Sequence, residues 1–307
     1  MILEQIGEYR IERQLARTRI CLEYVGQHLV LPRRAVVKLM TPTAEPLPAQ
    51  MLREACLLEA LHHPGAVRVY ESGLLADKRP WFARELVEGP TIASNLAPGM
   101  AERIDVISLL RDVADVLAHA HQRGVIHGNV RPDRIVMCGR SREFPICIPD
   151  WSEARAHDAA SVRSIDSVAS WYYTAPEVAS GDSIDDRADV FSLGVIAYRL
   201  LTGQLPFAGS MAHTSNGHIR HVPTEVHCPE APRELTGLVD QMLALDHGDR
   251  PSAADVHADL AWLAHVISMP AASATGLVRI RQPRWTPSLE LYEPSVDADV
   301  ATEHERD

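Results

Sequence analysis

Apolar and polar residues alternate along residues 9–40, most clearly in YRIERQL and HLVLPRRAVVKLM. A two-residue period places successive side chains on opposite faces of a strand, so this segment predicts an antiparallel sheet. Residues 50–61 instead carry apolar residues at helical spacing, and His63-Pro64-Gly65 marks the end of that helix. The stretch 66–89 returns to strand character and predicts two strands joined by a turn.

After Gly89 the pattern becomes helical. Apolar residues at helical spacing predict helices over 101–124, 189–203, 233–245 and 252–268. A strand-rich first third followed by a helix-rich remainder predicts an α+β fold with two lobes. We expect one folded domain over residues 8–266, with a sheet lobe at about 8–88 and a helical lobe at 89–266.

Residues 267–307 differ in composition from the rest of the chain. They are rich in Pro and Ala and end in an acidic run, which predicts a tail that is disordered in part.

The overall charge and the cysteines narrow the function classes. A formal net charge of −11 argues against a nucleic-acid-binding surface. The five cysteines are dispersed and odd in number, which indicates reduced thiols rather than a disulfide framework. No apolar run reaches the roughly 18 residues of a membrane span, and the N-terminus lacks a signal-peptide pattern. These features predict a cytoplasmic protein.

Five short motifs follow one another in a fixed order. They are Ala35-Val36-Val37-Lys38, Arg53-Glu54-Ala55, the ten residues HGNVRPDRIV at 127–136, Asp150-Trp151-Ser152, and Ala175-Pro176-Glu177. In this order and at these intervals the chain resembles the eukaryotic-like Ser/Thr protein kinases of bacteria, over about residues 8–266. The resemblance implies a bilobal kinase fold with a small antiparallel β-sheet lobe, one helix beside it, and a larger helical lobe.

The resemblance assigns roles to the retained residues. Lys38 is expected to contact nucleotide phosphates and to pair with Glu54, and Asp150 to hold one magnesium ion. Asp189 is expected to anchor the backbone of the loop at 127–136, and Arg250 to pair with Glu177. Trp151 and Ser152 replace the Phe and Gly of the family's Asp-Phe-Gly motif, and the tryptophan is expected to stack in the core.

Two groups that perform chemistry in the family are replaced. Asn129 stands at the catalytic Asp position, where an amide cannot accept a proton at neutral pH. Arg134 stands at the position of the second magnesium ligand, where a guanidinium cannot bind a cation. Gly128 replaces the arginine that in the family reads phosphorylation of the following loop, so control by that route is not expected through Ser161, Ser164, Ser167 or Ser170.

The nucleotide loop is also altered. Its three glycine positions are Ala16, Thr18 and Cys21, and the valine that covers adenine in the family is Glu23. Glycines allow backbone N–H groups to approach phosphates closely, so these substitutions argue against ATP binding. Val36 adds bulk in the same pocket.

Arg84 stands at the gatekeeper position, where the family has an apolar residue. A buried guanidinium requires a partner. We expect Arg84 to pair with Glu54 in competition with Lys38; the alternative is a one- or two-residue shift of the alignment, which would place Arg84 on the surface.

Three hypotheses follow. The first is a pseudokinase, a regulatory or scaffolding module with weak or absent phosphotransfer that acts through a protein partner. The second is an active Ser/Thr kinase with an atypical site, in which Lys38, Glu54 and Asp150 still hold ATP and magnesium. The third is a scaffold that binds ATP without turning it over. The number of substituted site residues favours the first.

Overall fold

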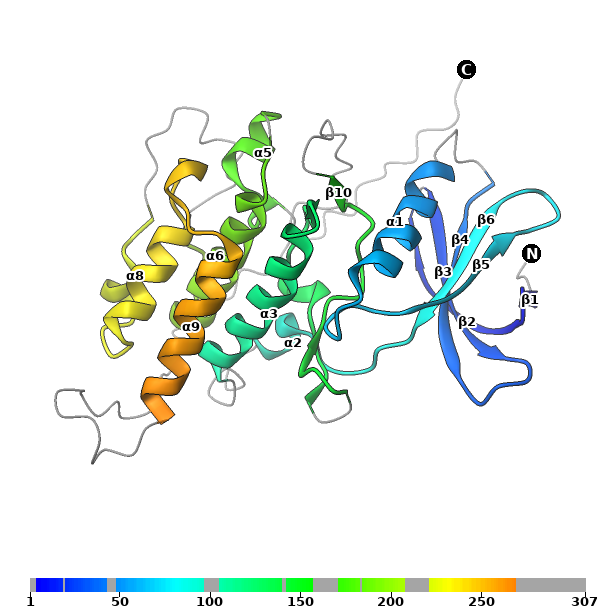
Figure 1. The fold of residues 1–307 in the computed structure, drawn as a ribbon, viewed down its shortest axis with the longest axis horizontal. Coiled ribbons are helices and arrows are strands. Elements are labelled where there is room, and N and C mark those ends of the chain that lie inside the picture. The colour runs from blue at the N-terminus through cyan, green and yellow to red at the C-terminus, as the bar shows by residue number, and fades with distance from the viewer. Residues whose placement is uncertain are drawn as a thin grey trace, which may run out of the picture.

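The computed structural model describes residues 4–18, 20–42, 48–96, 105–139, 142–156, 171–182, 184–207 and 221–268. The four serines at 161–170 and the tail beyond residue 268 lie outside the described residues. The chain forms two lobes: a curled antiparallel sheet with one helix, and a mainly helical lobe (Figure 1). The predicted fold class, α+β and bilobal, is confirmed.

The small lobe is a six-stranded sheet in the order β1-β2-β3-β4-β6-β5. Its strands are β1 Gln5–Ile6, β2 Tyr9–Arg17, β3 Cys21–His28, β4 Arg34–Met40, β5 Val69–Leu74 and β6 Pro80–Glu85. The helix α1, Pro48–Leu61, lies between this sheet and the large lobe (Figure 1). All neighbouring strands pair antiparallel, as the alternating sequence predicts.

The central strand β4 is buried on both faces, and its successive side chains point alternately to one face of the sheet and to the other. Ala35, Val37 and Leu39 pack into a cluster with Trp81 on one face of the sheet. The alternate residues of the same strand, Lys38 among them, point to the other face. The two-residue period therefore places a buried lysine on the face that meets the second lobe.

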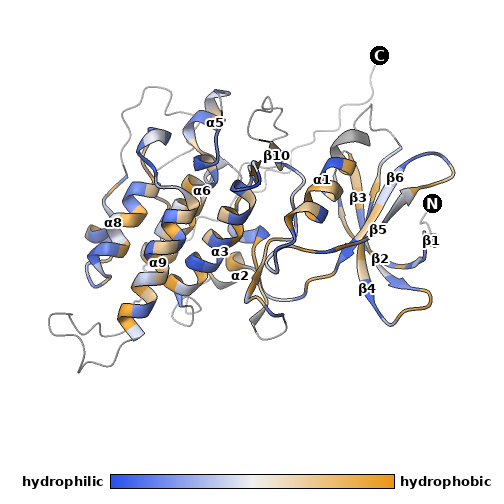
Figure 2. Cartoon of the chain, viewed as in Figure 1, coloured by the Kyte–Doolittle hydropathy of each residue, from blue (hydrophilic) through white to orange (hydrophobic). Residues whose placement is uncertain are grey.

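The large lobe is built from helices around a single apolar core. Its helices are α2 Ile92–Asn95, α3 Val106–His121, α5 Pro176–Ser180, α6 Arg187–Thr202, α7 Thr224–His227, α8 Arg233–Met242 and α9 Ala253–Ser268. Short 3-10 turns occur at η2 Pro132–Arg134 and η5 His247–Asp249. Helix α3 packs against α9 and α6, and polar and apolar segments alternate along these helices (Figure 2). In the described part of the chain, no helix combines the length and apolar character that crossing a membrane requires.

Four short strands lie where the lobes meet. Strands β7 Val125–Ile126 and β10 Arg155–Ala156 pair with each other, as do β8 Val136–Met137 and β9 Ile146–Cys147. The turns between them carry the loop at 127–136 and the segment that starts at Asp150.

The carboxylate of Asp189 fixes the loop at 127–136. It accepts hydrogen bonds from the backbone N–H groups of His127 and Gly128, both at 2.8 Å, and from the His121 ring at 2.9 Å. Burial would raise the pKa of Asp189, but these donors outweigh it and hold the pKa below its usual value. The anchoring role expected for Asp189 is confirmed. Gly128 has a φ of +74°, a backbone conformation that favours glycine.

The large lobe also contains a buried ion pair between Arg250 and Glu177. Arg250 donates to both carboxylate oxygens of Glu177, at 2.7 and 2.9 Å. The Arg250 side chain is fully buried, and it also donates to the carbonyls of Ala244 and Leu245. The expected Glu177–Arg250 pairing is confirmed.

Replacing Glu177 with alanine is expected to lower the free energy of unfolding by about 3–5 kcal/mol, because it leaves the Arg250 charge buried without its partner. Urea denaturation of the folded variant measures this loss.

Glu225→Ala is the matched control, because Glu225 pairs with Arg233 at 3.2 Å while both side chains are more than half exposed. Its cost is expected to stay below about 1 kcal/mol. Equal losses for the two variants would contradict a structural role for the buried pair.

Candidate functional site

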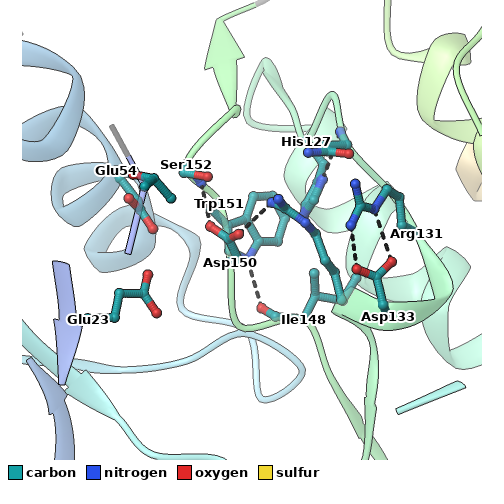
Figure 3. A network of polar contacts seen from close by, with 12 residues as sticks. Glu23, Glu54, His127, Arg131, Asp133, Ile148, Asp150, Trp151 and Ser152 are labelled. Carbon is teal, nitrogen blue, oxygen red and sulfur yellow. Dashed lines mark hydrogen bonds and ion pairs between the residues drawn. The ribbon is translucent and has the colours of Figure 1, made fainter. Parts of the chain in front are cut away.

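The predicted site residues converge where the inner face of the sheet meets α1 and the loops of the large lobe (Figure 3). Lys38 comes from β4, Glu54 from α1, and Asp150 from the segment after β9. Lys38 Nζ lies 2.7 Å from Glu54 Oε2, and both side chains are almost completely buried. The structure therefore brings together the lysine and glutamate that the motifs pair.

Lys38 lies among three carboxylates. Beyond Glu54, its ammonium is 3.5 Å from Glu23 Oε1 and 4.0 Å from Asp150 Oδ1. Burial alone would lower the pKa of Lys38, but Glu54, Asp150 and Glu23 outweigh it and hold that pKa above its ordinary value. Lys38 is therefore a permanent cation at neutral pH.

Arg84 corrects one prediction. It is buried, with 6% of its surface exposed, so the alternative that placed it on the surface is wrong. Its ion-pair partner is Glu23, with Nη2 3.4 Å from Oε2, whereas Glu54 is held by Lys38. Strand register explains the difference: Glu23 pairs with Lys38 across β3 and β4, and Arg84 pairs with Val36 across β6 and β4. Glu23 and Arg84 thus reach each other diagonally over one face of β4.

The Asp150 carboxylate forms an ion pair with Arg134, a residue of the same lobe. The Arg134 guanidinium donates to Asp150 Oδ2, and the backbone N–H of Ser152 donates to Oδ1 at 3.1 Å. Burial would raise the pKa of Asp150, but Lys38, Arg134 and Arg84 outweigh it and hold that pKa well below its usual range. The two positions that hold magnesium in the family are here bonded to each other.

The Asn129 side chain is buried, with 8% of its surface exposed. Its amide oxygen has almost no solvent contact and finds no hydrogen-bond partner among the described residues. Asn129 is one of the residues that line a small cavity of about 10 Å³, roughly the space of one water molecule. An amide at this position provides no general base at neutral pH.

Trp151 is fully buried, as expected from its place in the motif. Its indole N–H donates to the Ile148 carbonyl at 2.9 Å, and its ring meets the His127 ring edge-on at 4.7 Å (Figure 3). Between them these contacts join the Asp150 segment to the loop at 127–136.

Thr18 lies in the turn between β2 and β3, Cys21 is the first residue of β3, and Ala16 lies in β2. The Thr18 hydroxyl accepts hydrogen bonds from the backbone N–H groups of Ile20 and Cys21, at 3.3 and 3.0 Å. The Thr18 N–H itself donates to the Cys21 carbonyl at 2.8 Å. Three donors of the turn are thus used internally, a role for Thr18 that motif comparison alone did not reveal.

A magnesium ion does not fit the residues present as they are bonded in this structure. A magnesium ion requires oxygen ligands at about 2.0–2.1 Å. The Asp150 carboxylate already binds the Arg134 guanidinium, which offers donors only. Lys38, Arg84 and Arg134 balance Glu23, Glu54 and Asp150, so the cluster is neutral without a ligand.

Comparison with known proteins agrees with the motif order. The sequence profile described as "Protein kinase domain" matches residues 32–262. The chain is 28% identical to the serine/threonine-protein kinase pkn2 of Myxococcus xanthus, over 84% of this chain and 32% of that protein.

Two mycobacterial proteins are similar at 32% identity. These are the serine/threonine-protein kinases PknJ of Mycobacterium tuberculosis, over 71% of this chain and 38% of that protein, and PknB of Mycobacterium leprae, over 77% and 40%. The chain thus spans about a third to two fifths of the length of these relatives. The chain belongs to the protein kinase domain family, within its eukaryotic-like bacterial Ser/Thr kinase branch.

Proposed function

We propose that this chain is a pseudokinase: a kinase-fold module with weak or absent phosphotransfer that regulates or scaffolds a protein partner. The observation that carries the proposal is Asn129, an amide at the position of the general base whose oxygen is buried. Loss of a general base typically lowers a rate by about 10²–10⁴.

The preserved frame supports a binding role. Asp189, Glu177 and Arg250 keep the contacts that shape the large lobe, and Lys38 and Glu54 hold α1 against the sheet. A partner protein would meet a surface of constant shape. Substitutions confined to the chemical groups, over an intact frame, are typical of a module kept for its shape.

An active Ser/Thr kinase is the second candidate. The 2.7 Å contact of Lys38 with Glu54 and the retention of Asp150 favour it, and the relatives named above are called serine/threonine-protein kinases. Under this reading the chain would use ATP and magnesium through an unusual site. A third candidate, ATP binding without turnover, rests on the same three residues. Two measurements separate the candidates.

The first measurement is phosphate transfer from ATP to a generic basic protein substrate, with magnesium and with manganese. The wild-type chain is expected to give no more product than its Asp150→Asn variant, because the base is missing and the metal ligand is occupied. A known active kinase domain assayed in parallel serves as the positive control. Transfer by the wild type that is abolished in Asp150→Asn would establish the second candidate instead.

The second measurement is a thermal-shift titration with ATP and magnesium. A ligand at 100 times its Kd stabilises the native state by about 2.7 kcal/mol, which raises the Tm of a domain of this size by roughly 5–10 °C. We expect no saturable rise at up to millimolar ATP. A saturable rise that is lost in Lys38→Met would support nucleotide binding and favour the third candidate if no phosphate is transferred.

A further inference from the structure

We infer that the Arg134 guanidinium is a built-in counter-cation of Asp150 that replaces a divalent metal ion, so that the cleft of this chain is metal-independent. The inference rests on the proposed function and deepens it, since it names the group that removes metal dependence.

Both carboxylate oxygens of Asp150 are already in contact with groups of the protein. Its Oδ2 accepts from the Arg134 guanidinium, and its Oδ1 accepts from the Ser152 N–H at 3.1 Å with Lys38 Nζ at 4.0 Å. Both oxygens therefore already face positive groups or donors. A metal ion entering here would have to displace the guanidinium, and Arg134 cannot become a ligand in exchange, because it carries no acceptor.

The position of Arg134 is the second step. It is the last residue of the 3-10 turn η2, whose backbone is closed by a 3.0 Å hydrogen bond from the Arg134 N–H to the Arg131 carbonyl. The next residue, Ile135, is completely buried, and its carbonyl accepts from the Ile92 N–H at 3.0 Å. The guanidinium thus projects from a fixed backbone, and its side chain is only 15% exposed.

Charge balance is the third step. Glu23, Glu54 and Asp150 meet Lys38 within 4.0 Å, and one lysine cannot neutralise three carboxylates. Arg84 compensates Glu23, and Arg134 compensates Asp150. In active relatives of this fold, bound divalent ions neutralise charge at the corresponding place. Here fixed arginines do so, and removing Arg134 would leave a net negative cluster around Asp150.

A neighbouring arginine offers a matched control. Arg131 lies on the same loop and is similarly buried, with its side chain 11% exposed. It pairs with Asp133, its Nε lying 3.0 Å from Oδ1 (Figure 3). Replacing Arg131 removes the same charge from the same loop and leaves the Arg134–Asp150 contact in place.

The test is binding of Mn²⁺ alone, without nucleotide, followed by the loss of the electron paramagnetic resonance signal of free Mn²⁺. Wild type, Asp150→Asn, Arg134→Asn, Arg131→Asn and the double variant Arg134→Asn/Asp150→Asn are compared. Arg134→Asn restores an amide oxygen beside a free carboxylate, which are oxygen ligands that hard divalent cations prefer. We expect it to bind one Mn²⁺ per chain at least tenfold more tightly than wild type and Arg131→Asn. The double variant is expected to lose this gain.

Two outcomes overturn the inference. One is Mn²⁺ binding by the wild type that disappears in Asp150→Asn, which would show that Arg134 yields to a metal. The other is a folded Arg134→Asn variant with no gain over wild type. If Arg134→Asn does not fold, the wild-type titration against Asp150→Asn decides alone: absence of Asp150-dependent binding supports the inference. Asp150-dependent Mn²⁺ binding by the wild type without phosphate transfer would refute only this inference, whereas phosphate transfer by the wild type would refute the proposed function.

Discussion

The cleft of this protein is organised around the need to neutralise buried charge. Lys38 is buried with Glu54 at 2.7 Å, and Glu23 and Asp150 lie within 4.0 Å of the same ammonium. Isolated buried charges are costly, and paired ones are tolerated only with good geometry. Arg84 and Arg134 supply the missing positive charge from two different elements, β6 and the end of η2. The positions of these arginines follow from the carboxylates they compensate.

Motif order predicted the fold and the anchors of the large lobe, because the family resemblance assigns each anchor residue a partner in another motif. The contacts of Asp189 with the backbone of His127 and Gly128, and of Arg250 with Glu177, have the expected form. The helices over 106–121, 187–202, 233–242 and 253–268 begin and end within five residues of the predicted bounds. Apolar periodicity over ten or more residues is a strong signal, since one face of each helix must be buried.

The individual contacts in the site could not be predicted from the sequence, because they depend on the tertiary structure. Arg84 was expected to pair with Glu54, but strand register places Glu23 diagonally beside it on the same face of the sheet. The contact of Arg134 with Asp150 joins residues 16 apart across two turns, which no local pattern reveals. The internal use of backbone donors by Thr18 is equally hidden, because it depends on the conformation of the turn rather than on the loss of glycine.

The ion network also changes how the lobes are joined. In an active kinase, nucleotide and metal ions lie between the lobes and contribute contacts to both. Here Asp150 and Arg134 from the large lobe, with Lys38 and Glu54 from the small lobe, form a continuous set of charged contacts without a ligand. A ligand shifts a conformational equilibrium only by its differential affinity for the two states. Because the charged residues of the cleft already neutralise one another, we expect a metal-bound nucleotide to have nearly the same affinity for the different arrangements of the lobes. Under the proposed function the arrangement of the lobes is set by the chain itself, and a protein partner would bind the same arrangement whether or not nucleotide is present.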